Sequence, residues 1–157
     1  MADPTTFNQE VREIIFERAQ KVAEQLGHRE IEPEDLLIAT TRAASTAPLF
    51  RHLGVEPDDL ARRLLAAAPR GPHKGAMNRQ HSIESGRKTI RMWKQARRVG
   101  TPEVGAQEFL LALLDPPPKR FLFVFPRPTP PFWAALEAAG ITEATILRAI
   151  HELRGAA

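Results

Sequence analysis

The two halves of the chain share a repeated pattern of residues, and this repeat limits the possible folds more than any other feature. An offset of 73 residues brings identical residues together, among which Arg18, Lys21, Ala23, Gly27, Leu37 and Ala39 match Arg91, Lys94, Ala96, Gly100, Leu110 and Ala112. Further along the chain the offset becomes 86, at which Gly54, Leu60 and Leu64 match Gly140, Ile146 and Ile150. Such self-similarity indicates one structural unit used twice. The offset grows by 13, which predicts a 13-residue insertion in the second half.

Within each half, apolar residues recur at three- and four-residue steps, which is the period of an α-helix. Glycines follow the expected helix ends, and prolines or acidic residues stand at several expected starts. We therefore expect helices at 8–26, 33–43, 48–53 and from Pro57 in the first half, and at 82–99, 105–114, 132–139 and 143–154 in the second. The predicted fold class is all-α: a pseudo-twofold duplication of a four-helix repeat, eight helices in all, with a Pro/Phe-rich insertion in the second repeat.

A length of 157 residues fits one domain, here covering 1–157. We expect repeat one at 7–68 and repeat two at 81–155, with the insertion at about 116–131. Residues 69–80 between the repeats are expected to form a linker, because the stretch PRGPHKGAMN is dense in proline and glycine.

The insertion lies within PPPKRFLFVFPRPTPPFW, which holds 7 of the 14 prolines and 5 of the 10 aromatic residues. Proline removes backbone donors, so this segment is not expected to be helical. Phe121, Phe123 and Phe125 alternate as one face of an extended strand does. These three residues and Trp133 are candidate partner-binding residues. In the alternative interpretation, the phenylalanines pack onto the core of repeat two instead of offering apolar surface or an edge strand to a partner.

Charge is distributed unevenly along the chain. Residues 1–61 carry a net charge of −6, residues 62–98 carry +10 and residues 99–157 carry −1. Within the basic segment, a basic face repeats at helical steps and comprises Arg87, Arg91, Lys94 and Arg98. Such a face is either solvated, or paired with the acidic first half, or used to contact the phosphates of a nucleic acid.

Several kinds of chemistry are excluded or disfavoured. The absence of cysteine excludes disulfides, thiolate nucleophiles and cysteine-ligated metal sites. The sequence has no Gly-x-Ser-x-Gly motif and no two histidines at an i, i+4 spacing, so we expect no catalytic residues, no metal and no cofactor. His28 and His52, at helix ends, are expected to be surface or capping residues. With no signal-peptide pattern and no apolar run of about 18 residues, the expected location is the cytoplasm, away from membranes.

Four stretches carry a resemblance to a known family: AQKVAEQLGHREIEPEDLLIA at 19–39, LFRHLGVEPDDLARRLL at 49–65, ARRVGTPEVGAQEFLLALL at 96–114 and ALEAAGITEATILRAI at 135–150. Together they resemble the N-terminal domain of Clp unfoldases, the Clp R domain of the ClpC, ClpA and ClpB type. The resemblance implies an all-α fold of two four-helix repeats and a role in recruiting substrates or adaptors to a Clp ATPase and protease. No Gly-x-x-x-x-Gly-Lys-Ser/Thr loop is present to hold a nucleotide, so the expectation is a free-standing domain without the ATPase.

In the ClpC branch of the family, each repeat can bind a phosphorylated arginine through a hydroxyl residue and a glutamate. By resemblance the corresponding positions are Gln9 and Glu34 in repeat one, and Ser82 and Gln107 in repeat two, with Thr6 as an alternative to Gln9. Gln107 lacks the charge that pairs with a guanidinium, so neither pair is intact. In the alternative interpretation, Glu34 and Asp35 are first-turn charges that stabilise their helix.

The leading functional hypothesis is a non-enzymatic module that binds protein or peptide clients, a Clp ATPase or an adaptor, and acts as an adaptor, a decoy or a sequestering protein. The alternative is a nucleic-acid-binding regulator that uses the basic segment 62–98.

Overall fold

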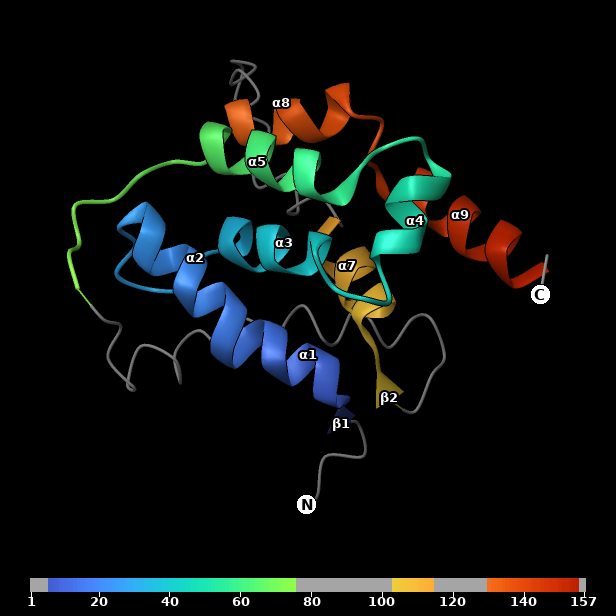
Figure 1. Cartoon of the computed structure of the whole chain (residues 1–157), viewed down its shortest axis with the longest axis horizontal. Helices are drawn as coiled ribbons and strands as arrows, with labels where there is room; N and C mark the ends of the chain where they lie inside the picture. The colour runs from blue at the N-terminus through green and yellow to red at the C-terminus, as the bar shows by residue number, and fades with distance from the viewer. Residues whose placement is uncertain (1–5, 76–102, 115–129, 156–157) are drawn as a thin grey trace, which may run out of the picture.

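The computed structural model describes residues 6–75, 103–114 and 130–155. The fold of these residues is all-helical apart from one pair of two-residue strands (Figure 1). The first half contains β1 (Thr6–Phe7), α1 (Gln9–Glu13), the π-helical turn η1 (Ile14–Arg18), α2 (Ala19–Leu26), α3 (Pro33–Thr41), α4 (Ala47–His52) and α5 (Pro57–Ala67). The second half contains β2 (Glu103–Val104), α7 (Ala106–Leu114), α8 (Pro131–Ala138) and α9 (Glu143–Gly155).

The helices expected within the described ranges are present, with ends that differ by one or two residues from the sequence prediction. The helix predicted at 82–99 and residues 116–129 of the insertion lie outside the described residues. The eight-helix duplication as a whole therefore stays a prediction.

The N-terminal helix is continuous from α1 through η1 to α2. Its first turn is capped by Asn8, whose side-chain oxygen accepts a hydrogen bond from the Val11 backbone N–H at 2.9 Å. Its end is Gly27, which has the left-handed φ of 73° that glycine adopts without steric cost. A π turn in the middle, as in η1, accommodates one residue more than an α-helix of the same length.

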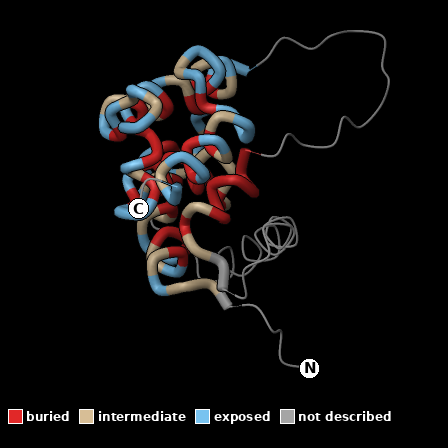
Figure 2. Tube along the Cα trace, turned by 90° about the vertical axis from the view of Figure 1, so that its right-hand side faces the viewer, coloured by how far each residue is buried: buried red, intermediate tan, exposed pale blue. Residues whose placement is uncertain are grey.

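Helices α3 and α7 form the centre of the molecule. Every residue of α3 from Asp35 to Thr41 is buried, and Gln107 alone among the residues of α7 is not. A helix that is apolar nearly all round must be covered on all sides. Helix α3 packs against α2, η1, α5 and α7, and Figure 1 shows it between α5 above and the N-terminal helix below. Figure 2 shows the buried segments inside the molecule and the exposed ones on its outer helices.

The two halves also meet at several further places, among them α1 against α7. Helix α5 packs against α8, and α4 packs against α9. Strands β1 and β2 pair in parallel, with Thr6 opposite Glu103 and Phe7 opposite Val104. The Phe7 ring stands edge-on to Phe109 of α7, with the two centroids 6.2 Å apart. Thr6 and Phe7 are thereby fixed against the second half.

Among the described residues, no helix is both long enough and apolar enough to cross a membrane.

Candidate functional site

Three of the residues assigned by resemblance to peptide binding stand at helix starts, whereas Thr6, the alternative to Gln9, lies in β1. Gln9 is the first residue of α1, Glu34 lies in the first turn of α3, and Gln107 lies in the first turn of α7. The remaining predicted site residues lie outside the described residues; these are Ser82, the basic face Arg87, Arg91, Lys94 and Arg98, and the insertion phenylalanines Phe121, Phe123 and Phe125.

The start of α3 is built around a fully buried carboxylate, Asp35. Its Oδ2 accepts a hydrogen bond from the Glu32 backbone N–H at 2.8 Å, and together the two residues form a capping box. The same carboxylate lies 2.8 and 2.9 Å from Nδ1 of His28, which follows the end of α2. Asp35 is therefore committed to the fold. Glu34, one residue earlier, is half-buried, and no hydrogen bond or ion pair joins it to another residue of the described part of the chain.

His28 is buried, with 8% of its surface exposed, so the expectation of a surface position is wrong for this histidine, although its backbone N–H donates to the Ala23 carbonyl at the end of α2 at 2.8 Å. Its Nδ1 faces Asp35, and its Nε2 lies 2.6 Å from the backbone carbonyl oxygen of Pro69. Two acceptors on opposite sides of the ring explain how a polar side chain is accommodated there. The expectation of a surface residue holds for His52, whose Nε2 lies 2.5 Å from Oε2 of Glu152 on α9.

Burial and hydrogen bonding oppose each other in this pair. Burial alone lowers the pKa of His28, but its hydrogen bonds to the Asp35 carboxylate and the Pro69 carbonyl outweigh burial, and the pKa stands above its ordinary value of 6.5. Burial raises the pKa of Asp35 above 3.8, against the opposing effect of the hydrogen bonds from Glu32 and His28. The geometry, with donors directed at both Asp35 oxygens, favours an imidazolium beside a carboxylate.

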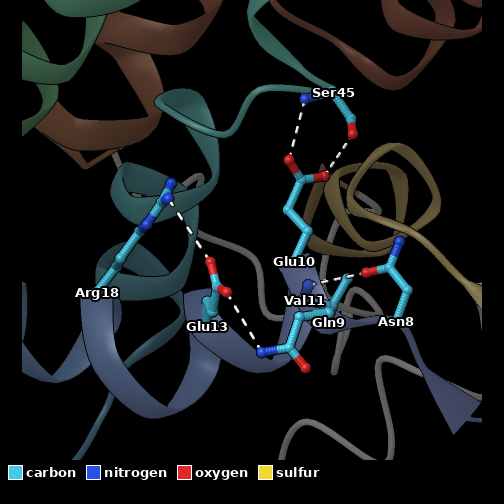
Figure 3. A network of polar contacts seen from close by, with 7 residues as sticks. All are labelled: Asn8, Gln9, Glu10, Val11, Glu13, Arg18 and Ser45. Carbon is cyan, nitrogen blue, oxygen red and sulfur yellow. Dashed lines mark hydrogen bonds and ion pairs between the residues drawn. The ribbon is translucent and has the colours of Figure 1, made fainter.

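At the start of α7, the residue corresponding to Glu34 is Gln107, and its side chain is hydrogen-bonded within the protein. The Gln107 side-chain amide donates to the Ser45 backbone carbonyl at 3.1 Å, in the turn between α3 and α4. On its other side, Ser45 donates from its backbone N–H and its hydroxyl to the Glu10 carboxylate, at 3.1 and 2.5 Å (Figure 3). Ser45 thus joins α1 to α7. A glutamate at position 107 has no N–H to donate to this carbonyl, so glutamine has a structural role of its own here.

Gln9 has a local partner. Its side-chain amide donates to Oε1 of Glu13 at 3.3 Å, and Oε2 of Glu13 lies 3.9 Å from Nη2 of Arg18 (Figure 3). Asn8, one residue earlier, holds the N-cap position.

The remaining described candidate, Trp133, is half-buried on α8. Its ring packs edge-on against the fully buried Phe132, with the centroids 5.5 Å apart, and it lies against the hydrophobic core.

Two features escaped the sequence interpretation. Glu108 of α7 is buried, and its Oε1 lies 3.7 Å from Nη2 of Arg154 near the end of α9. Phe16, inside the π turn, is 52% exposed and is the one large apolar side chain that the described part of the chain leaves exposed. Its position off the apolar stripe of residues 8–26 was the signal for this exposure.

Among the described residues, no three histidine, aspartate or glutamate side chains gather in a way that could hold a metal ion.

Comparison with known proteins identifies a family. A family model described as the Clp repeat (R) N-terminal domain matches residues 6–122, which is 117 of the 157 residues. The match includes the starts of both α3 and α7, and α8 and α9 lie beyond it. No curated protein matches the chain.

Proposed function

Because the chain belongs to the Clp repeat N-terminal domain family, we propose that it binds segments of client or adaptor proteins in a Clp system and catalyses no reaction itself. The observation that carries the proposal is the family match over both helix starts at which client contacts are expected by resemblance. The proposed binding role is that of an adaptor, a decoy or a sequestering protein.

The proposed fold behind this role is a pseudo-twofold duplication of a four-helix repeat. Helix α3 at 33–41 and helix α7 at 106–114 stand 73 residues apart at both ends. The starts of α5 and α9, at 57 and 143, stand 86 apart, as do the left-handed glycines Gly54 and Gly140. These spacings equal the two offsets of the sequence repeat, which supports the duplication.

The π turn sharpens the proposed equivalence between the repeats. Because η1 accommodates one extra residue, positions before it are offset by 74 and not by 73. The residue equivalent to Ser82 then becomes Asn8, the observed N-cap, in place of Gln9. We therefore propose Asn8 and Glu34 as the polar residues of the first-repeat binding site.

Glu34 is proposed to bind a cationic side chain, with arginine as the preferred partner. A guanidinium forms two parallel hydrogen bonds to a carboxylate, and such charge-assisted pairs are about twice as strong as neutral ones. Glu34 is suited to this role because Asp35 beside it is already committed to His28 and Glu32. In the second repeat Gln107 has no charge and is bonded to Ser45, so client binding is proposed to depend on the first repeat.

Peptide binding tests this function directly. Fluorescently labelled peptides that contain arginine or phosphoarginine are titrated with the whole chain and with Glu34→Gln. We expect the variant to bind about tenfold more weakly, a loss of about 1.4 kcal/mol. The matched control is Glu143→Gln, an exposed glutamate in the first turn of α9, which should bind as the unchanged chain does. Equal affinity of Glu34→Gln and the unchanged chain would contradict the role of Glu34.

A second candidate function, nucleic-acid binding, rests on the +10 charge of residues 62–98. Titration of labelled DNA and RNA at two salt concentrations tests it. Affinity that falls steeply with salt supports this function, and no binding at low salt removes it.

A further inference from the structure

The first residues of the predicted linker, directly after α5, are hydrogen-bonded to the end of α2. Residues 69–73, here called the strap, lie along the end of α2. The Gly71 backbone N–H donates to the Leu26 carbonyl at 2.9 Å, and the His73 N–H donates to the Gly27 carbonyl at 2.9 Å. The two backbones are so close that a Cβ on Gly27 or on Gly71 would stand 2.2 Å from the carbonyl oxygen of the other. Only glycine at both positions permits this approach.

His28 fixes the strap at its beginning. The buried ring lies between two acceptors, with Nδ1 at 2.8 Å from the Asp35 carboxylate and Nε2 at 2.6 Å from the Pro69 carbonyl oxygen. The Pro69 oxygen can only accept, so Nε2 must carry a proton. The Asp35 carboxylate faces Nδ1, so a proton is required on that side as well. Both contacts exist together only while the pair holds one proton more than a neutral ring beside a carboxylate.

Loss of that proton leaves one ring N–H for two acceptors. The charged and fully buried Asp35 is the stronger acceptor and retains it. The lone pair of Nε2 then faces the lone pairs of the Pro69 oxygen, and the contact at 2.6 Å becomes repulsive.

We propose that the strap is a proton-dependent latch: it is closed on α2 while His28 is an imidazolium and detaches at Pro69 when His28 loses its proton. The latch adjoins the client site, since Asp35 follows Glu34 in the chain, but the inference does not rest on the proposed function.

The carboxylates around His28 favour the protonated ring and therefore the closed form. The groups that face it or flank it are Asp35, Glu32 and Glu34 at the start of α3, Arg29 and Glu30 in the loop after α2, and Arg70, His73 and Lys74 on or beside the strap. The pKa of His28 is raised above 6.5, because its bonds to Asp35 and Pro69 outweigh burial. Since the folded pKa exceeds the unfolded one, the stabilisation is complete below 6.5 and is lost as pH rises through the raised value.

Opening the latch frees the first part of the connection that follows α5. Five residues, 69–73, are released from α2, and at about 3.4 Å per residue of extended chain they can span up to about 17 Å from the end of α5 in a direction no longer set by α2. The proton therefore controls the reach of the segment between α5 and the second half.

Amide hydrogen exchange of the whole chain tests the latch. Protection of the Gly71 and His73 amides, corrected for the intrinsic effect of pH on exchange, is measured from mildly acidic to alkaline pH. We expect it to fall by about tenfold or more as His28 deprotonates, followed in parallel by the ring nitrogen signals of His28. The reference is the Ile141 amide, which donates to the Leu136 carbonyl at the end of α8 and should stay protected.

Three variants complete the test. His73→Gln should keep the transition, since His73 contributes its backbone and not its ring to the strap. His28→Gln should lose protection of Gly71 at all pH values. Asp35→Asn should move the transition to lower pH, because the ring loses its anionic partner, and this result remains informative if His28→Gln fails to fold. Protection of Gly71 that is independent of pH, or a His28 ring that titrates below 6.5, would overturn the proposal.

Discussion

The starts of α3 and α7 stand 73 residues apart, at the places that the proposed duplication makes equivalent, but they are stabilised in different ways. At α3 the buried acid, Asp35, is matched by a histidine seven residues earlier in the chain. At α7 the buried acid, Glu108, is matched by Arg154, which lies 46 residues later and is largely exposed. The His28–Asp35 pair joins residues close in sequence and is buried, whereas the Glu108–Arg154 pair joins distant residues and is open to solvent.

The neighbouring residue differs too. Glu34 has no partner among the described residues, while Gln107 is bonded to Ser45 and through it to Glu10 of α1. We propose that repeat one keeps the Glu34 carboxylate for ligands, whereas repeat two uses Gln107, at the corresponding position, to hold the halves together. The following predictions test this difference, beginning with the largest effect.

Removal of the buried acid should lower the free energy of unfolding far more for Asp35 in repeat one than for Glu108 in repeat two. Asp35→Ala leaves His28 without its anion in a buried site and also removes the capping box, so we expect a loss of about 3–5 kcal/mol. Glu108→Ala breaks a pair with the exposed Arg154, and we expect about 1 kcal/mol. Urea denaturation of both variants measures the difference. Equal losses would mean that the two sites are energetically alike.

Substitution of the glycine that ends a helix should also destabilise the protein more in repeat one, at Gly27, than in repeat two, at Gly140. Gly140→Ala introduces a Cβ into open space at a φ of 74°, and the strain should cost about 1–2 kcal/mol. Gly27→Ala has the same strain and also displaces the strap, with two backbone hydrogen bonds, for a total of about 3 kcal/mol. Thermal or urea unfolding of the two variants compares these costs. A Gly27→Ala variant no less stable than Gly140→Ala would show that the strap adds nothing to stability.

The sequence predicted the helices well because their signals are local. Pro33 and Pro57 mark helix starts, Gly27 and Gly140 mark ends, and the apolar period connects them. The all-α class and the family followed from the same short-range patterns repeated in order.

The site was less predictable because its contacts are distant in sequence. His28 is joined to Pro69, 41 residues away, and Gln107 is joined to Ser45, 62 residues away. Neither residue type signals such a partner, so a histidine after a glycine was interpreted as a surface group. The π turn also left little trace, because an apolar stripe tolerates one extra residue and Phe16 simply falls outside it.

Restoring a charge at position 107 tests whether repeat two has exchanged a ligand for an internal contact. Gln107→Glu replaces the donor to the Ser45 carbonyl by a carboxylate, so we expect a loss of stability of about 1 kcal/mol. Glu34→Gln should change stability by less than about 0.5 kcal/mol, since no described contact is removed. Unfolding and peptide binding are measured on the same samples. A gain of arginine-peptide affinity in Gln107→Glu, without loss of stability, would contradict the proposed division.

The smallest effect is expected at the contact between α4 and α9, where the halves meet in solvent. The hydrogen bond from His52 lowers the pKa of Glu152 below its ordinary value of 4.5, and both side chains are substantially exposed. Because the folded pKa is the lower one, the pair contributes above pH 4.5, and its contribution is lost as pH falls through the lowered value. Melting temperatures in acid should therefore fall slightly less for Glu152→Gln than for the unchanged chain, and Glu143→Gln on the same helix should follow the unchanged chain. The expected change is small because a screened ion pair at the surface contributes little to stability. A large change in acid stability for Glu152→Gln would contradict this and would mean that the exposed pair, and not the contact of Ser45 with Gln107, holds the two halves together.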